Sequence, residues 1–550
     1  HIHTCDKKLI ESFEKLKMNL RFSVESYFNS VFRMAGSHNK SSVSPKNELV
    51  TFLLALLVLI LLLQQIFRKY WGANTLKCFQ KQSGLEKRWD KLPRVSLLRQ
   101  MWICRDKRNI IQSSRQLAKE YGMLARLTVL GEEYVYLNSP ALAEKLLSSR
   151  NLRHSAKPPQ LYENLFDMIG NGVITSKGEF WHSQRKQLSK GFTYTALRKY
   201  TKIYNKCAKR VVKELSEMFA GSETEYKPIN PLIQTGGIEI IAETVMGLDT
   251  TQHKEDATLV FESVNRWKEL VFQRFSSGWL VLPFFWKLHP LSRKYSQCIT
   301  NIDGVIKNMI NRFQKQFQLD LKTEFMFSTK GYETVSATMQ FLIFMLALHQ
   351  NHQIACREEI DRMFSDPSRC PDGNLTIEAL SEMKHLERCL LETLRMFPIA
   401  FATGRQLEDP LKIGKKEIIK IYLKILCGLF IDEELIIPAG VNAVIPILLF
   451  HKSEDNFPQP DEFQPERFLP ENCVKRHPFA YQPFSAGPRA CVGMKFSLLE
   501  AKTIVAHILR NFEVYTSDKI DDVAVIPSIL LRPERDYLFC LKKRNFEGNV

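Results

Sequence analysis

Residues 484–493, Phe-Ser-Ala-Gly-Pro-Arg-Ala-Cys-Val-Gly, place one cysteine in a loop bracketed by two glycines. Gly487 and Gly493 permit backbone conformations and close approaches that a Cβ atom would prevent. The residues that follow, from Met494 to Glu500, have the pattern of a helix, and a helix N-terminus carries partial positive charge. That charge stabilises an anionic sulfur. The stretch therefore predicts a functional thiolate at Cys491 rather than an inert core cysteine.

This stretch resembles the haem-binding loop of the cytochrome P-450 superfamily. In that loop the Phe packs against the thiolate segment, the Arg reaches a haem propionate and the Cys is the fifth ligand of the iron. The resemblance implies these roles for Phe484, Arg489 and Cys491, and makes Gly487 and Gly493 part of the haem-binding loop. The implied cofactor is haem b, iron protoporphyrin IX.

Two further motifs match propionate-binding positions of the same superfamily. Trp181 and Arg185 are predicted to lie one turn apart on one face of a helix that begins near Gly178, where they can hold a carboxylate. The resemblance assigns this pair to a haem propionate. Arg405, in Thr-Gly-Arg, stands where the family places another propionate ligand.

Gly331 lies in a predicted helix that continues into an apolar run, residues 339–348, although a glycine inside a helix costs about 1 kcal/mol relative to alanine. The resemblance makes this the distal helix, in which Gly331 lets oxygen approach the backbone and Glu333 and Thr334 relay protons. Lys330 departs from the Glu, Ala or Gly common in relatives. A covalent haem ester is therefore not expected.

Glu392 and Arg395 are spaced to pair on one helical face. The resemblance adds Arg467, from Pro-Glu-Arg-Phe, as a second partner of the same carboxylate. We expect these three residues to form a buried structural network that supports the cysteine loop.

Short strands alternate with many helices downstream of residue 100. Residues 134–137 read as a strand, and Pro140 then begins a helix. The predicted fold is mostly α with small β-sheets (α+β), and the resemblance makes it a cytochrome P-450 fold behind an N-terminal transmembrane helix. The expected organisation is an N-terminal extension 1–48, an anchor 49–67, a basic linker 68–100 and a haem-thiolate catalytic domain 101–550.

Residues 49–67 carry no charge and are long enough to cross a bilayer as a helix. Arg68, Lys69 and a basic linker follow, which predicts a single pass in the endoplasmic reticulum membrane with the catalytic domain cytosolic. A cleaved signal peptide is the alternative, but its apolar region would be too long and no small-residue cleavage site follows. We expect translation to start at Met34 and residues 1–33 to lie outside the natural protein.

The chain has 550 residues, 45% of them hydrophobic, and a formal net charge of +18. No nucleic-acid motif accompanies the spread basic residues, so an anionic membrane surface or an acidic redox partner is the better explanation of the charge. Twelve cysteines occur without a C-x-x-C pair. Their spacing indicates neither a disulfide framework nor a zinc site.

Two stretches depart from the family spacing. The stretch from Ile306 through Phe317 runs almost directly into Leu321, where relatives carry roughly another helix, and residues 414–431 form an insertion. The codons for Gly-Lys-Lys and Phe-Ile-Asp can contain splice-donor and splice-acceptor sequences, and removal of 414–431 restores the family spacing. We hypothesise an unremoved intron, with the missing helix a skipped exon, so that the chain is an imperfect gene translation.

The motifs occur in family order, and the stretches FWHSQRK and PFAYQPFSAGPRACVGMKFSLLEAK are most similar to membrane-bound animal enzymes of the fatty-acid ω-hydroxylase group. The implied activity is insertion of one oxygen atom of O₂ into a lipophilic substrate such as a fatty acid, steroid or xenobiotic. The implied partners are an NADPH-dependent flavoprotein reductase, cytochrome b5 and membrane lipid. A haem-thiolate isomerase or dehydratase and an inactive haem-binding relative remain the alternatives.

Overall fold

The structure is a computed structural model, in which the chain divides into two units, His1–Ala73 and Asn74–Val550. The described residues all belong to the second unit; they are 89, 92–96, 99, 110–129, 132–159, 162, 170–222, 224–245, 254–277, 280, 283–317, 325–413, 435–527 and 529–545. The predicted extension and membrane anchor, residues 1–67, and the insertion 414–431 lie outside them. None of the helices in the described part of the chain combines the length and apolarity needed to span a bilayer.

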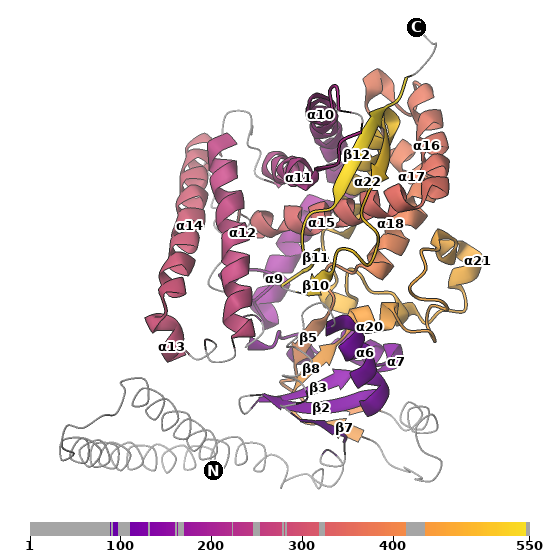
Figure 1. Ribbon diagram of the computed structural model, residues 1–550. Coiled ribbons are helices and arrows are strands. Elements are labelled where there is room, and N and C mark those ends of the chain that lie inside the picture. The colour runs from indigo at the N-terminus through magenta and orange to yellow at the C-terminus, as the bar shows by residue number, and fades with distance from the viewer. Residues whose placement is uncertain are drawn as a thin grey trace, which may run out of the picture. The chain divides into compact units, whose positions relative to one another are not determined.

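The described part of the chain is mostly helical, as predicted, and Figure 1 shows the strands β2, β3, β5 and β8 below most of the helices and β12 near the C-terminal end. The longer helices are α6 (Ile110–Tyr121), α7 (Pro140–Leu147), α9 (Gly178–Ser189), α10 (Tyr194–Met218), α11 (Asn230–Val245), α12 (Lys254–Ser276), α14 (Pro290–Phe317), α15 (Phe325–Leu348), α16 (Gln350–Ser365), α18 (Lys384–Met396) and α22 (Met494–Asn511). Shorter ones are α13 (Pro283–Leu288), α17 (Ile377–Glu382), α20 (Ile447–His451) and α21 (Pro470–Cys473).

The strands form four small sheets. The largest has the order β1-β2-β3-β8-β5, and the others are β4-β12-β9, β6-β7 and β10-β11. The strands are β1 (Arg94–Val95), β2 (Leu124–Val129), β3 (Glu132–Leu137), β4 (Lys227–Pro228), β5 (Thr403–Gln406), β6 (Leu411–Ile413), β7 (Leu435–Ile437), β8 (Asn442–Ile445), β9 (Phe512–Thr516), β10 (Val525–Pro527), β11 (Leu531–Pro533) and β12 (Leu538–Lys543).

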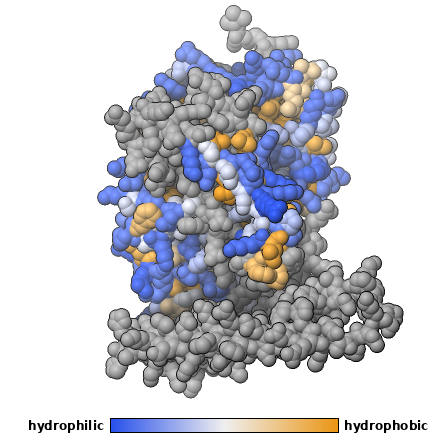
Figure 2. Space-filling model, turned by 90° about the vertical axis from the view of Figure 1, so that its left-hand side faces the viewer, coloured by the Kyte–Doolittle hydropathy of each residue, from blue (hydrophilic) through white to orange (hydrophobic). Residues whose placement is uncertain are grey.

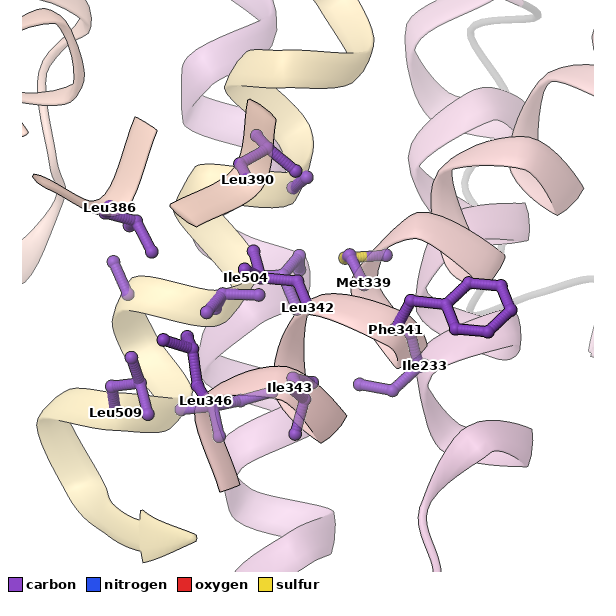
Figure 3. Close-up of a cluster of buried hydrophobic side chains, with 14 of the residues drawn as sticks. Ile233, Met339, Phe341, Leu342, Ile343, Leu346, Leu386, Leu390, Ile504 and Leu509 are labelled. Carbon is purple, nitrogen blue, oxygen red and sulfur yellow. The ribbon is translucent and has the colours of Figure 1, made fainter. Parts of the chain in front are cut away.

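Helix α15 forms the centre of the main core. Its residues from Phe341 to Met345 are fully buried, because α11, α18 and α22 all pack against it. Figure 3 shows side chains of this cluster, among them Leu342 and Leu346 of α15, Leu390 of α18 and Ile504 of α22. Truncating one such leucine to alanine is expected to cost about 2–5 kcal/mol. The long apolar run in the sequence therefore forms the central helix of the main core.

Several predicted elements are confirmed. The predicted strand at 134–137 is part of β3, and Pro140 is the first residue of α7. Gly178 begins α9, which carries Trp181 and Arg185 one turn apart. Two of these elements have a local signal in their own sequence, which is the proline at the first turn of α7 and the strand-like pattern of β3.

The insertion 414–431 falls between two paired strands. Ile413 at the end of β6 lies opposite Leu435 at the start of β7 in an antiparallel ladder. Without residues 414–431 only three residues, Asp432, Glu433 and Glu434, would connect the strands. Hairpin loops commonly have about 2–5 residues. The register of the pair therefore suits the short connection that the intron hypothesis requires.

Candidate active site

The backbone around Cys491 has a conformation that its glycines allow. Ser485 and Gly487 have φ angles of 59° and 71°. A Cβ atom on Gly487 would lie 1.7 Å from the carbonyl oxygen of Leu147, the last residue of α7. The carbonyl of Phe484, a residue packed against the main core, accepts a hydrogen bond of 2.9 Å from the Cys491 N–H. Glycine is therefore sterically required at position 487.

Gly493 is less constrained by the protein itself. It is the N-cap of α22 and has a φ of −87°, which other residues adopt. An added Cβ would lie 3.7 Å from the ring of Phe192 and 4.0 Å from the Cys491 sulfur, which is ordinary contact. The described protein atoms leave room for a methyl group here. A requirement for glycine at 493 would have to come from a group bound beside the sulfur.

The Cys491 thiol is accessible, although protein atoms crowd around it. Its side chain is exposed, yet burial by the surrounding protein raises its pKa. A hydrogen bond from the Gly493 N–H and the charge of Arg185 act in the opposite direction and lower that pKa. Together these observations indicate an accessible sulfur among closely packed protein atoms, aided toward the anion by the N-terminus of α22 and a nearby guanidinium.

A group of cations lies next to this sulfur. Burial, together with the charges of Arg405 and Arg185, lowers the pKa of Arg489 to about 9. Burial likewise lowers the pKa of Arg405 to about 10. The pKa of Lys157 lies well below its usual value, because of burial and then the charges of Arg405 and Arg489. Arginine stays protonated in proteins, so the lowered pKa values do not mean that these side chains lose their charge. They indicate instead that it costs free energy to hold several positive charges close together in a partly buried site.

The cations are held by neutral partners. Arg489 donates to the backbone carbonyls of Val173 and Ser176 at 3.2 and 2.6 Å, and its guanidinium lies 4.1 Å from the centre of the Trp181 ring. Arg405 donates to its own strand, at the Thr403 hydroxyl and the Gly404 carbonyl. In the part of the chain that the structure describes, no carboxylate pairs with Arg489, Arg405, Lys157 or Arg185. The cluster is therefore complementary to an anion.

The structure thus brings together five residues that the sequence analysis selected from three separate segments, which are Trp181, Arg185, Arg405, Arg489 and Cys491. It adds Lys157, whose ammonium lies 3.3 Å from both the Tyr162 and the Thr403 hydroxyls. The sequence analysis missed Lys157. Its only local signal is its position just before Pro158 and Pro159, in a chain with 77 lysines and arginines.

Glu333 and Thr334 lie in α15, and Glu333 has a partner that the sequence did not predict. Lys268 of α12 donates to a Glu333 carboxylate oxygen at 2.6 Å, and the two side chains are only 15% and 13% exposed. The Thr334 carbonyl accepts a 2.8 Å hydrogen bond from the Thr338 hydroxyl. Gly331 is helical in its backbone, while its surroundings and those of Lys330 lie outside the described residues. The acidic residue of the predicted relay is therefore neutralised by a lysine.

Glu392, Arg395 and Arg467 meet in the interior. Arg395 donates two hydrogen bonds to the Glu392 carboxylate, at 2.7 and 2.8 Å, and the Arg467 Nε atom lies 3.3 Å from the same group. Arg395 also donates to the carbonyl of His451, whose ring accepts a hydrogen bond from the Gln482 N–H. Gln482 precedes Phe484 by two residues. The network is thus connected to the segment that leads into the cysteine loop.

Comparisons with known proteins agree with this arrangement. The family model for cytochrome P450 matches residues 91–329 and 321–541, two segments that share residues 321–329 just ahead of the predicted distal motif. Cytochrome P450 4c3 of Drosophila melanogaster is 27% identical over 448 residues, which cover 73% of this chain and 78% of that protein.

Two further relatives extend the comparison. Cytochrome P450 4V2 of Pongo abelii is 26% identical over 540 residues, covering 86% of this chain and 96% of that protein. Probable cytochrome P450 4ac3 of Drosophila melanogaster is 29% identical over 428 residues, covering 71% and 76%. The chain belongs to the cytochrome P450 family, whose cofactor is haem, and is a monooxygenase of that family.

Proposed function

We propose that Cys491 supplies the thiolate ligand of a haem b group in an enzyme that oxygenates a lipophilic substrate. The observation that carries this assignment is the exposed thiol beside a cluster of cations, the buried Arg405 and the partly buried Arg489 and Lys157, that have no carboxylate partner among the described residues. A thiol alone would suit many functions. A thiol next to a binding site for two carboxylates matches the iron and the two propionates of haem.

The residues fit this cofactor in charge and in shape. Arg489, Arg405 and Lys157 would hold the propionates. Trp181 would stay stacked on Arg489 when a propionate carboxylate replaces the water around that guanidinium. The buried Nε atom of Arg489, which has no hydrogen-bond partner in the described protein, is one donor available for this purpose. Gly493 leaves space beside the sulfur. Haem, when bound, would supply the activation of dioxygen and the transfer of one oxygen atom.

The chain itself would supply a ligand and a proton path. Burial raises the pKa of the Cys491 thiol, and the Gly493 N–H and Arg185 oppose this effect by stabilising the anion, so both would help the sulfur to bind a metal as a thiolate. Thr334 and Glu333 of α15 would hold and deliver the protons that the reaction consumes. Because Lys268 holds the Glu333 carboxylate, proton delivery would require this ion pair to open or a water molecule to bridge it.

The proposed setting is the endoplasmic reticulum membrane, with residues 49–67 as a single-pass anchor, 68–100 as a linker and the catalytic domain from 101 onward in the cytosol. Phe284 and Leu288 of α13 are 68% and 70% exposed, which suits contact with lipid. Figure 2, on the side of α12 to α14, shows small hydrophobic patches on a mostly hydrophilic face.

The proposed electron donors are an NADPH-dependent flavoprotein reductase and cytochrome b5, and the net charge of +18 suits acidic partners. The proposed substrate is lipophilic, of the fatty-acid, steroid or xenobiotic type. The stretch 397–401 before β5 and the β10–β11 turn are proposed as apolar pocket walls; Phe397, Ile399 and Ile526 are buried there.

A reduced carbon-monoxide difference spectrum tests the ligand assignment. Wild-type protein should give the thiolate-type spectrum, and Cys491→Ala or Cys491→His should abolish it while the far-UV circular dichroism stays helical. Cys298→Ser, which alters a buried cysteine of α14, is the control and should keep the spectrum. A thiolate-type spectrum in Cys491→Ala would end the assignment.

A further inference from the structure

Two neighbouring helices remote in sequence from Cys491 each carry a histidine and a cysteine four residues apart. In α16 these are His352 and Cys356, and in α18 they are His385 and Cys389. Residues at this spacing lie on one face of a helix. The two helices pack against each other, so the two faces meet. No residue of this group was selected in the sequence analysis.

Two separations among the candidate ligand atoms, one between the histidines and one between the cysteines, match the edges of a tetrahedral metal site. The His352 Nδ1 and His385 Nε2 atoms are 3.2 Å apart, and the Cys356 and Cys389 sulfurs are 3.9 Å apart. With Zn–N bonds of about 2.0–2.1 Å and Zn–S bonds of about 2.3 Å, the edges of a tetrahedron are about 3.4 Å for N–N and about 3.8 Å for S–S. Both observed separations lie close to these edges.

A third observation joins the two pairs. One nitrogen each of His352 and His385 and the sulfur of Cys389 all lie within 4.8 Å of one another. Three candidate ligands are therefore already gathered. The Cys356 sulfur lies 3.9 Å from that of Cys389 but outside this group, so it would have to move toward the histidines to become the fourth ligand. Both cysteines are fully buried, whereas the histidines are partly exposed. An ion can reach such a site from the histidine side.

We propose that His352, Cys356, His385 and Cys389 bind one zinc ion between α16 and α18. Binding forms two Zn–S and two Zn–N bonds and releases the two thiol protons to solvent. The two thiolates balance the charge of the divalent ion, so the completed site carries no net charge into the interior. The sequence has no C-x-x-C pair, which argued against a zinc site whose ligands are close together in sequence. That argument does not apply to a site whose ligands come from two separate helices.

The neighbouring groups decide how the site would form. Glu359 accepts hydrogen bonds from the His385 and Leu386 N–H groups at 3.0–3.1 Å, which fixes the first turn of α18. An Arg388 nitrogen lies 3.0 Å from the His385 Nδ1 atom. When zinc binds the other ring nitrogen, Nδ1 carries a proton and no longer accepts, so Arg388 must turn toward solvent. Removing this cation should strengthen zinc binding.

The site would have a consequence for the haem side of the molecule. Helix α18 carries His385 and Cys389 in its first turns and Glu392 and Arg395 in its last. A zinc ion that joins α16 to α18 would therefore brace the helix that holds the Glu392 network. The zinc proposal rests on α16 and α18 alone and does not depend on the assignment of Cys491.

The test uses the haem-loaded full chain, purified with a thiol reductant, incubated with zinc chloride and freed of excess metal. Elemental analysis should find one zinc per chain in wild type, and X-ray absorption at the zinc edge should show sulfur together with nitrogen neighbours. Cys356→Ser/Cys389→Ser should lose at least nine-tenths of the zinc, and Cys298→Ser should lose none. Arg388→Ala should retain zinc against a chelator better than wild type.

Several results would overturn the proposal. Elemental analysis could find less than a tenth of a zinc ion per wild-type chain, or as much zinc in the double cysteine variant as in wild type. X-ray absorption could also show that only nitrogen and oxygen atoms surround the zinc. Peptide mapping that finds Cys356 and Cys389 joined as a disulfide in the reduced preparation would do the same. If the double variant fails to fold, His352→Asn, at a partly exposed position, replaces it and should release zinc to the chelator severalfold faster.

Discussion

The loop around Cys491 and the Glu333–Thr334 turn of α15 are held by different kinds of contact. The loop is fixed by its own backbone, through the positive φ angles of Ser485 and Gly487 and the hydrogen bond between Phe484 and Cys491. The turn on α15 is part of a regular helix, and its Glu333 side chain is held by an ion pair with Lys268, which comes from another helix. The loop around Cys491, the cysteine side, should therefore be rigid and intolerant of substitution. The Glu333–Thr334 turn, the distal side, should be more adjustable.

The largest effect is expected at Gly487. In Gly487→Ala the new methyl group would collide with the Leu147 carbonyl oxygen, at 1.7 Å, so that α7 or the loop must move. We expect loss of the haem-bound protein, measured as the yield of the carbon-monoxide spectrum per milligram of protein. Gly440→Ala is the matched control, because it also has a positive φ but meets no atom within 4 Å. Its cost should be only the backbone strain, about 1–3 kcal/mol.

A wild-type spectrum and thermal midpoint in Gly487→Ala would contradict a rigid cysteine side. Equal losses in the two alanine variants would show instead that backbone strain, and not contact with α7, makes glycine necessary at position 487.

The second prediction concerns the Glu392 network. Glu392 is fully buried with Arg395, so Glu392→Gln leaves buried guanidinium charge without its counter-charge. Breaking such a pair is expected to cost about 3–5 kcal/mol, measured by urea unfolding. Glu382→Gln breaks an exposed pair with Arg369 and should cost less than about 1 kcal/mol. Similar midpoints for the two variants would mean that the network does not support the cysteine side.

The third prediction uses Glu500, in the helix that follows Cys491. Both carboxyl oxygens are buried without a hydrogen-bond partner in the described protein, and burial raises the pKa of Glu500 well above 4.5. The folded state therefore keeps a proton that the unfolded chain releases. The stability from this group is complete below about pH 4.5 and is lost as the pH rises toward the folded pKa.

Glu500→Gln should remove this dependence, a slope of up to about 1.4 kcal/mol per pH unit above pH 4.5, and should be more stable than wild type near neutral pH. Urea unfolding at a series of pH values measures it. Glu513→Gln, on the neighbouring β9, should leave the slope in place. Parallel wild-type and Glu500→Gln curves would show that the carboxyl group is hydrated in the folded protein.

The two sides also differ in how far the sequence could predict them. The residues of the cysteine loop are contiguous, so their spacing alone specifies the turn, the helix start and the thiol. The α15 and α18 motifs could be found for the same reason. Lys268 could not, because it reaches Glu333 across 65 positions through the packing of α12. The four residues between α16 and α18 were missed likewise, since a His and a Cys four apart are unremarkable until two helices bring two such pairs together.

The smallest effect is expected on the adjustable side. Thr334→Ala removes a hydroxyl from the proposed proton path but touches neither Cys491 nor the propionate site. NADPH consumption should continue while hydrogen peroxide per product rises severalfold. Thr338→Ala, one turn further along α15, is the matched control and should stay coupled. Loss of haem in Thr334→Ala would show a structural role for this residue instead.

Substitutions of Lys268 test whether its ion pair with Glu333 limits proton delivery. If the ion pair limits proton delivery, Lys268→Met should free the Glu333 carboxylate, lower the peroxide released per product and reduce the solvent isotope effect on turnover. Lys268→Arg keeps a cation opposite Glu333 and should resemble wild type. In the Thr334→Ala background Lys268→Met should change little, because a freed carboxylate cannot replace the missing hydroxyl. More peroxide in Lys268→Met than in wild type would mean that the ion pair holds Glu333 in its working position, and the distal side would then be as rigid as the cysteine loop.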